Sequence, residues 1–259
     1  MRAALTIAGS DSGAGAGVQA DLKTFAAYGV YGTCAITAVT AQNTTGIARI
    51  EALPADLVIA QIEAVVSDFG IDAAKTGMLP TAPIVEAVAA AVARLGIRRL
   101  VIDPVLVATS GERLADVAAA DALRNTLLPH ATVVTPNVPE AEALSGVRIR
   151  SADDCREAAR RIAALGPAAV VITGGHLPVA DVGDLLYDGT TFADLRHDRV
   201  PGRHTHGTGC TFSAAVTAAL VLDHPLRDAV QEAQAYVARA IAAAPGLGAG
   251  RGPLGHVVR

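Results

Sequence analysis

Short apolar runs alternate with longer alanine-rich stretches along most of the chain. The short runs predict strands at 3–8, 32–41, 71–77, 99–104, 131–136 and 169–174. The stretches between them predict helices at about 17–28, 55–68, 81–95, 116–127, 137–145 and 152–165. Several of the strands are apolar almost throughout, as is typical of strands that are covered on both faces. Strands and helices that alternate in this way predict a parallel sheet between two layers of helices.

The pattern changes in the last third of the chain. Residues 181–197 predict a β-hairpin, because Asp188 and Gly189 form a turn dipeptide between two strand-like runs. Two long helices are expected at about 210–222 and 226–244, followed by a loop-like tail at 245–256. The sequence contains no internal repeat and no obvious linker. We therefore expect residues 1–259 to form one α/β domain.

Composition narrows the classes of function. Half of the 259 residues are apolar (51%) and 18% are charged, which is enough for a substantial core. The net charge of −4 and the lack of a basic run argue against nucleic acid as a partner. No apolar run approaches the roughly 18 residues of a membrane span, and the apolar start is too short for a signal peptide.

The three cysteines, Cys34, Cys155 and Cys210, are far apart and form no CxxC motif. This spacing indicates neither a disulfide framework nor a zinc site. We therefore expect the protein in a reducing cytoplasm.

Polar and glycine-rich clusters follow each predicted strand: "GSDSGAGAG", "QNTTG", "TGM", "DPV", "TPNVPE" and "GGH". In open parallel sheets, ligands bind beyond the carboxyl ends of the strands. Together with "HGTGC" at 206–210, these clusters would line one rim of the sheet. This convergence predicts a small-molecule site more strongly than any single motif.

The first cluster has the layout of a nucleotide-binding loop but lacks the Walker motif. Gly15, Gly17 and Ala20 match the dinucleotide pattern GxGxx[G/A]. The match starts about seven residues after the predicted strand, and the second strand ends in Gln42 and Asn43, with no acid for a ribose. These departures disfavour a nicotinamide oxidoreductase. A loop that lets a small substrate approach the backbone is favoured over a purely structural turn.

The segment "HGTGC" has the features of an anion-binding loop at a helix start. Gly207 and Gly209 allow the backbone N–H groups to face a phosphate, and the hydroxyls of Thr208 and Thr211 can donate to its oxygens. Cys210 lies in the first helical turn, where the positive end of the helix can lower a thiol pKa from about 8.5 to about 4–7. The alternative is an inert, buried cysteine.

Other candidates have structural alternatives of similar weight. Asn137 and Glu140 are spaced as a helix-capping box, but the same amide and carboxylate can bind Mg²⁺ beside phosphates. Asp21 suits a helix N-terminus, Gln42 suits a loop, and Met78 suits a core. His204 and His206 flank the anion loop but lack a third metal ligand nearby.

The segments "GTGC", "GSDSGAGAGVQADLKT", "TAVTAQNT", "KTGML" and "TPNVPEAEAL" occur in an order and spacing that closely resemble one known family. From about residue 3 to residue 255 the chain resembles the hydroxymethylpyrimidine/phosphomethylpyrimidine kinases of thiamin biosynthesis, in the ribokinase superfamily. The resemblance implies a ribokinase-like three-layer α/β/α sandwich with a mostly parallel central sheet and a late β-hairpin. It also implies a cytoplasmic homodimer. The expected reaction is Mg²⁺- and ATP-dependent phosphorylation of 4-amino-5-hydroxymethyl-2-methylpyrimidine (HMP), and then of its monophosphate to the diphosphate.

The resemblance also implies roles for individual residues. Cys210 would accept the hydroxymethyl proton, within an anion hole made by Gly207, Thr208 and Gly209. Asn137 and Glu140 would hold Mg²⁺, partly through water. The residues expected at the ATP phosphates are Asn137, Glu140, Asp103, Thr173 and Thr211. Those expected to line the pyrimidine pocket are Gly9, Asp21, Gln42, Met78 and Val105.

Two positions depart from the family pattern. Thr109 and Thr173 stand where many relatives carry a lysine near the nucleotide, so charge compensation of ATP is expected to differ. A pyridoxal kinase of the same branch is the nearest alternative, although Gln42 and Asn43 fit the pyrimidine enzymes better. A non-catalytic vitamin-binding protein is a more distant alternative.

Overall fold

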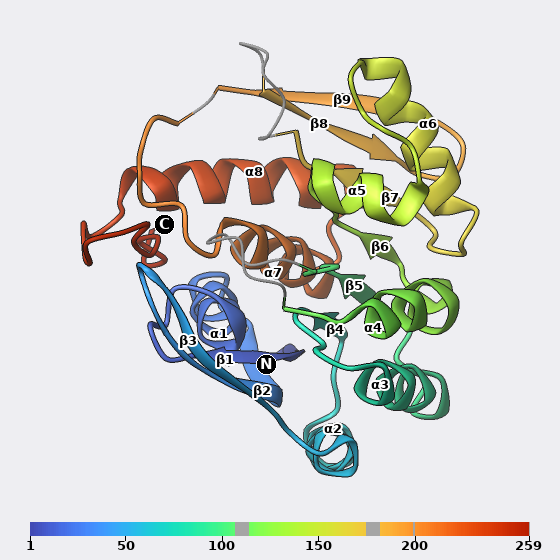
Figure 1. The fold of residues 1–259 in the computed structure, drawn as a ribbon, viewed down its shortest axis with the longest axis vertical. Helices are drawn as coiled ribbons and strands as arrows, with labels where there is room; N and C mark the ends of the chain where they lie inside the picture. The colour runs from blue at the N-terminus through green and yellow to red at the C-terminus, as the bar shows by residue number, and fades with distance from the viewer. Residues whose placement is uncertain (107–113, 175–181, 199, 259) are drawn as a thin grey trace.

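The computed structural model describes residues 1–106, 114–174, 182–198 and 200–258. Within these ranges, nine strands form one sheet in the order β3-β2-β1-β4-β5-β6-β7-β8-β9 (Figure 1). Neighbouring strands from β2 to β7 are parallel, whereas β3, β8 and β9 are antiparallel to their neighbours. The strands are β1 (Ala3–Asp11), β2 (Tyr31–Asn43), β3 (Gly46–Ala52), β4 (Ala73–Thr76), β5 (Leu100–Ile102), β6 (Val133–Val134), β7 (Val170–Ile172), β8 (Val182–Tyr187) and β9 (Phe192–His197).

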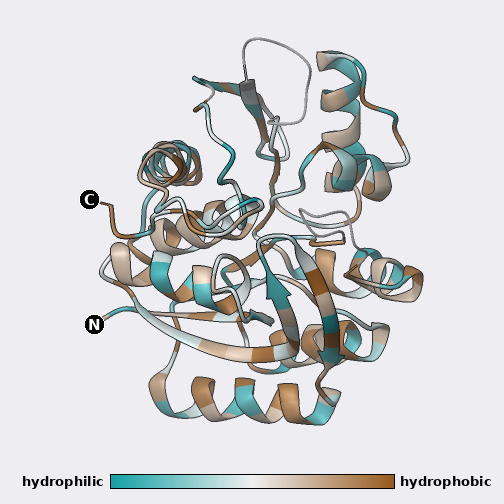
Figure 2. Ribbon diagram, turned by 60° about the vertical axis from the view of Figure 1, so that its left-hand side comes forward, coloured by the Kyte–Doolittle hydropathy of each residue, from teal (hydrophilic) through white to brown (hydrophobic). Residues whose placement is uncertain are grey.

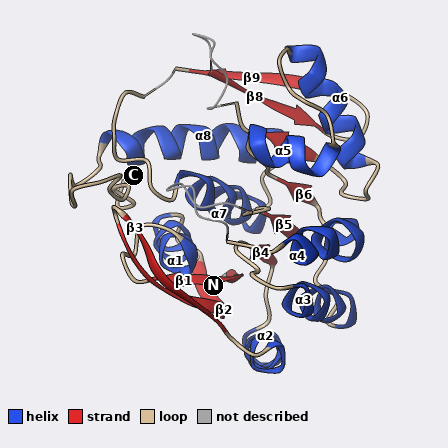
Figure 3. Ribbon diagram, in the orientation of Figure 1, coloured by secondary structure: helices blue, strands red, loops and turns tan. Residues whose placement is uncertain are grey.

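Helices cover both faces of the sheet (Figures 1 and 3). One layer consists of α1 (Gly17–Ala27), α7 (Thr208–Val221) and α8 (Leu226–Ala242). The other consists of α2 (Ala55–Phe69), α3 (Ala82–Arg94), α4 (Val117–Ala122), α5 (Val138–Ser145) and α6 (Ala152–Ala163). The predicted three-layer α/β/α fold with a mostly parallel sheet is therefore confirmed. None of the helices in the described ranges is long and apolar enough to cross a membrane.

The strand sequences explain why the sheet is buried on both faces. In β5, Leu100 and Ile102 pack into the core under α2–α6, and Val101 packs into the core under α7 and α8. Side chains of a strand point to alternate faces, so both faces must be apolar. Helix α7 is buried along nearly its whole length, and the outer helices in Figure 2 alternate between hydrophilic and hydrophobic residues.

The edges of the sheet differ from the sequence-based expectation. Strand β3 was not predicted, because most of its residues are at least partly exposed and form no apolar run. Strand β1 extends to Asp11, so the first loop is shorter than expected. The helix predicted at 116–127 continues from α4 into a π-helical turn at Leu123–Leu127.

The late hairpin of β8 and β9 is confirmed. The Asp188 carboxylate accepts hydrogen bonds from the N–H groups of Thr190 and Thr191, and Gly189 has a φ of 90°. Position 181, where the hairpin was expected to begin, lies outside the described residues. The helix expected at 210 already begins at Thr208.

Candidate active site

Cys210 lies at the carboxyl ends of the parallel strands, as the third residue of α7. The Asp103 carboxylate just beyond β5 and the Gly17 N–H at the start of α1 are both close enough to act on the pKa of its thiol. Lys75 of β4 and Asp21 of α1 are also close enough to act on its charge. The residue is partly exposed. The thiol therefore faces polar groups at the rim rather than an apolar pocket.

The expectation of a lowered thiol pKa at Cys210 is wrong for the ligand-free protein. Burial raises the pKa of this thiol to about 12, and the negative charges of Asp103 and Asp21 act in the same direction. The Lys75 ammonium lowers the pKa but does not compensate for burial. The helix N-terminus alone therefore does not produce a thiolate here, and the Cys210 thiol is protonated in the ligand-free protein.

A buried ion pair acts electrostatically on Cys210. The Lys75 ammonium donates to both carboxylate oxygens of Asp21 at 2.9 Å, and the Thr6 hydroxyl donates to one of them at 2.6 Å. Lys75 and Asp21 are both 0% exposed. The oxygens of Asp21 are therefore already bonded within the protein, and its expected contact with the pyrimidine stays a prediction. Lys75 was not among the predicted site residues, although a lysine in an otherwise apolar strand is a signal for a buried partner.

The Asn137–Glu140 pair forms the capping box of α5. The Asn137 N–H donates to the Glu140 carboxylate at 2.9 Å, and the Glu140 N–H donates to the Asn137 side chain at 3.0 Å. Burial and the neighbouring Asp103 charge raise the pKa of Glu140 to about 8, and burial also raises the pKa of Asp103. Two buried carboxyl groups that repel each other suit an oxygen-ligated divalent cation. The capping role and a metal-binding role are therefore compatible.

Thr173 was also expected at the nucleotide. Its backbone forms an isolated bridge to Asn137, and its N–H donates to the Pro136 carbonyl at 2.9 Å. The structure thus brings Thr173 beside the capping box. Thr109 and the end of the "GGH" segment lie outside the described residues.

The anion loop, residues 206–210, packs backbone to backbone against the first loop, residues 12–16. Gly207 has a φ of 82°, and a Cβ atom there would lie 1.9 Å from the Gly15 carbonyl oxygen. The N–H groups of Gly207, Gly209 and Cys210 make no backbone hydrogen bond to any described residue. Glycine is therefore required at 207, and the free N–H groups are available to an anion.

The two threonines of this region are not free donors. The Thr208 hydroxyl donates to the Thr205 carbonyl at 2.8 Å. Thr211 is 0% exposed, and its hydroxyl lies 3.0 Å from His256 Nε2 in the C-terminal segment. The expectation that Thr211 donates to phosphate therefore stays a prediction.

The expected pyrimidine-pocket residues lie in two groups. Gly9 and Met78 are adjacent, since a Cβ atom on Gly9 would lie 3.2 Å from the Met78 sulfur. Val105 follows Asp103, and its N–H donates to the Asp103 carbonyl at 2.9 Å. Gln42 is at the far end of β2 and contacts His206 of the anion loop. All of these residues lie at the carboxyl ends of strands, as predicted.

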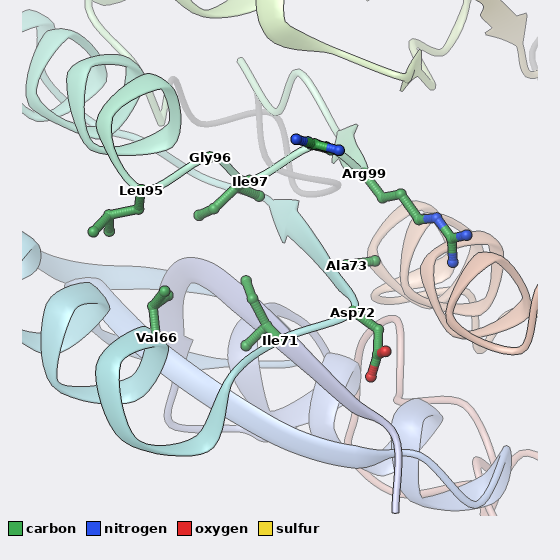
Figure 4. A pocket seen from close by; sticks show the side chains of 9 residues that line it. Val66, Ile71, Asp72, Ala73, Leu95, Gly96, Ile97 and Arg99 are labelled. Carbon is green, nitrogen blue, oxygen red and sulfur yellow. The ribbon is translucent and has the colours of Figure 1, made fainter.

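A cavity of about 270 Å³ lies at the opposite end of the sheet (Figure 4). It is lined by residues that precede or begin β4 and β5, such as Ile71, Ala73 and Arg99. It contains none of the predicted site residues. The chemistry of the site is therefore not located there.

Asp11 and His206 were not predicted as site residues. Asp11 accepts hydrogen bonds from the N–H groups of Gly13, Gly15 and Ala16, and from His206 Nε2 at 2.8 Å. These contacts link the first loop to the anion loop. The sequence signal was an aspartate within a run of glycines, which is typical of a side chain that organises a loop.

The sheet topology, the glycine loop at the start of α7 and the paired carboxyl groups define a ribokinase-like phosphotransferase. The chain belongs to the phosphomethylpyrimidine kinase family, whose model matches residues 11–255.

Characterised relatives cover nearly the whole chain. The hydroxymethylpyrimidine/phosphomethylpyrimidine kinases of Bacillus subtilis and Synechococcus elongatus are 44% and 50% identical, over 98% of this chain and 94% and 96% of theirs. The bifunctional thiamine biosynthesis protein ThiED of Geobacter sulfurreducens is 46% identical over 98% of this chain, which spans 52% of that protein. The family resemblance seen in the sequence is confirmed.

Solved structures show the same fold. The ADP complex of Bacillus subtilis pyridoxal kinase has a TM-score of 0.91 at 42% identity, covering 99% of this chain and 97% of that one. The pyridoxal kinase of Staphylococcus aureus in complex with ADP has a TM-score of 0.92 at 40% identity, covering 99% and 94%. Both neighbours are kinases that bind ADP. Together with the kinase family match, this supports ATP as the co-substrate.

Proposed function

We propose that this protein transfers the γ-phosphoryl group of ATP to the hydroxymethyl oxygen of HMP, and then phosphorylates the monophosphate to the diphosphate. The observation that carries the proposal is the position of Cys210. Cys210 belongs to the loop whose free N–H groups can hold the transferring phosphoryl group, and Asp103 is close enough to act on the pKa of its thiol. Positioning and charge stabilisation provide most of the catalysis in phosphoryl transfer. The assignment of HMP rests on the family and on the names of the relatives.

The proton of the hydroxymethyl group needs an acceptor. In the ligand-free protein the Cys210 thiol is protonated, because burial and the nearby Asp103 charge raise its pKa. We propose that the thiol proton moves to the Asp103 carboxylate as the sulfur accepts the hydroxymethyl proton. The buried Lys75 ammonium stabilises negative charge at both groups. Asp103 thereby becomes part of the proton path as well as of the nucleotide side of the site.

Magnesium is proposed as the cofactor. Asn137 and Glu140, with Asp103, present oxygen donors of the kind that Mg²⁺ prefers. When bound, the ion would neutralise charge on the ATP phosphates. We also propose that the protein works in the reducing cytoplasm, which is compatible with its three free cysteines. A single kinase domain and a homodimer are further parts of the proposal.

The proposal is tested by measuring ADP release with Mg²⁺-ATP and, in turn, HMP, HMP monophosphate and pyridoxal. We expect the pyrimidines to have the highest kcat/KM. Dominant turnover of pyridoxal would instead assign the protein to the activity named for its structural neighbours. No ADP release with any acceptor would favour a non-catalytic vitamin-binding protein.

A further inference from the structure

The segment of residues 250–256, which follows α8, packs against the start of the anion loop. The His206 N–H donates to the Gly252 carbonyl at 3.1 Å, and His206 forms an isolated parallel bridge with Pro253. A Cβ atom on Gly252 would lie 2.4 Å from His204 Nδ1, so the two stretches approach each other closely. The 250–256 segment therefore holds the backbone where the anion loop begins.

The same segment contacts the residue that directly follows Cys210. The Thr211 hydroxyl lies 3.0 Å from His256 Nε2. Thr211 is 0% exposed and His256 is 4% exposed, so the contact is shielded from solvent. Burial and the positive charge of Lys23 lower the pKa of His256 to about 4, so its imidazole is neutral at pH 7. A hydroxyl can donate to a bare ring nitrogen or accept from a protonated one, so the pair forms a hydrogen bond in either tautomer.

His256 is itself fixed to helix α8. The Tyr236 hydroxyl donates to the His256 carbonyl at 2.8 Å, and the Gly255 N–H donates to the Ala240 carbonyl at 2.9 Å. A Cβ atom on Gly255 would lie 2.1 Å from the Ala243 carbonyl oxygen, so this close approach requires glycine. Because its backbone is held by α8, the His256 ring can hold the first turn of α7 in place.

We propose that His256 is a positioning residue for phosphoryl transfer, and that it acts through the Thr211 hydroxyl on the backbone that carries Cys210 and the anion hole. The inference rests on the proposed function. The free N–H groups of the anion loop lie, in sequence, between its two contacts with the 250–256 segment. Donors of an anion hole act only when they are held where charge develops in the transition state. Loss of the contact is therefore expected to lower kcat more than substrate binding.

The competing role of Thr211 is direct donation to a phosphate oxygen, as the family resemblance implies. The two roles differ in what they require of His256. If Thr211 acted on phosphate by itself, removing the His256 ring nitrogen would leave kcat unchanged. If Thr211 acts as the link between His256 and the loop, removing either partner should have the same effect.

The test is a double-mutant cycle of Thr211→Val and His256→Leu, with kcat for HMP and the free energy of unfolding in urea measured for each protein. Each single variant leaves one buried polar group without its partner and should be less stable than the wild type. The double variant replaces both partners with apolar side chains of similar size, so its stability should recover. We expect kcat to stay about 10–100-fold below the wild-type value in all three variants, with KM for HMP and for ATP within about twofold. In a merely structural role, kcat would recover together with stability.

Thr217→Val is the matched control, because Thr217 is a second buried threonine of α7. Its hydroxyl donates within the helix, to the Ser213 carbonyl at 2.7 Å. We expect this variant to keep the wild-type kcat. Thr211→Ser keeps the hydroxyl and should retain most of the activity that Thr211→Val loses.

A second measurement needs no substrate. Amide hydrogen exchange across residues 206–211 should be faster in Thr211→Val than in the wild type, and unchanged in Thr217→Val. If the wild type does not phosphorylate HMP, the proposed function fails, and the exchange measurement still tests the contact.

Three results would overturn the role of His256. The first is wild-type kcat in the double variant, and the second is unchanged exchange across residues 206–211 in Thr211→Val. The third is a loss of kcat in Thr211→Val but not in His256→Leu, which would assign Thr211 to the phosphate instead. Equal losses in the two single variants and in the double variant would support the proposal, because two residues that act as one unit are not additive.

Discussion

The ammonium group of Lys75 lies 2.9 Å from both carboxylate oxygens of Asp21, and neither side chain is exposed to solvent. The pair joins β4 to α1 and is close enough to the thiol of Cys210 to act on its pKa. Lys75 also lies 3.8 Å from Asp103, so one buried cation serves two buried acids. Lys75 therefore balances the negative charges of Asp21 and Asp103, although its own side chain is fully buried.

Lys75→Met is expected to destabilise the protein strongly. It leaves Asp21 and Asp103 without their counter-charge, and breaking one side of a buried ion pair costs about 3–5 kcal/mol. The free energy of unfolding in urea measures the loss. Arg49→Ala is the matched control, because the Arg49–Glu51 pair is largely exposed and should contribute less than about 1 kcal/mol. Equal losses in the two variants would contradict the role given to Lys75.

Gly207→Ala is expected to disturb the anion loop. The residue has a φ of 82°, and the new Cβ would lie 1.9 Å from the Gly15 carbonyl oxygen, so we expect a loss of more than about 1 kcal/mol in stability. At Gly209 a Cβ would meet no atom within 4 Å. Thermal unfolding of Gly209→Ala should therefore resemble the wild type. A stable Gly207→Ala variant would show that the two loops are not packed as described.

The ligand-free thiol of Cys210 is expected to react slowly. Its pKa is raised to about 12, so its thiolate fraction at pH 7.5 is far below that of a free cysteine with a pKa of about 8.5. Iodoacetamide labelling followed by peptide mass spectrometry should show modification on the order of a hundredfold slower than for glutathione. The labelling rate should keep rising up to pH 9. A midpoint below pH 8 would instead support the thiolate that the helix N-terminus alone suggests.

Glu140 is expected to make the ligand-free protein less stable as the pH rises. Its pKa is raised from 4.5 to about 8 in the folded state, so between these values the folded protein holds a proton that the unfolded chain has lost. The stabilisation is fully present below pH 4.5 and is lost as the pH rises toward 8, by at most about 1.4 kcal/mol per pH unit.

The isosteric variant Glu140→Gln isolates this effect, since glutamine also serves in a capping box. Urea unfolding at pH 6 and pH 8 should show a smaller decline with pH in the variant than in the wild type. Added Mg²⁺ should restore stability at pH 8 to the wild type more than to the variant. Identical pH slopes for the two proteins would refute the raised pKa of Glu140.

Much of the site could be predicted because parallel strands end at a common rim. Met78 follows β4, Asp103 follows β5, and Cys210 lies in the first turn of α7. The order of strands and helices along the chain was enough to predict that these three positions converge. Helix α7 and Asp103 do meet there, since the Ser213 hydroxyl of α7 lies 3.1 Å from the Asp103 carboxylate. The edge strand β3 was not predicted because its sequence contains no run of apolar residues.

The supporting contacts were beyond the reach of the sequence. Asp11 and His206 are separated by 195 positions, and Lys75 and Asp21 by 54, so no local pattern pairs them. The thiol pKa of Cys210 was misjudged for the same reason. Helix position is visible in a sequence, but burial and the nearby carboxylates arise only when distant segments pack together.

The most direct test of the account is the rate of HMP phosphorylation by Cys210→Ala, measured with the equilibrium affinity for ATP. If the sulfur handles the hydroxymethyl proton, kcat should fall by about 10²–10⁴-fold while the Kd for ATP stays close to the wild-type value. A variant that keeps the wild-type kcat would contradict the account, because the proton would then leave without Cys210.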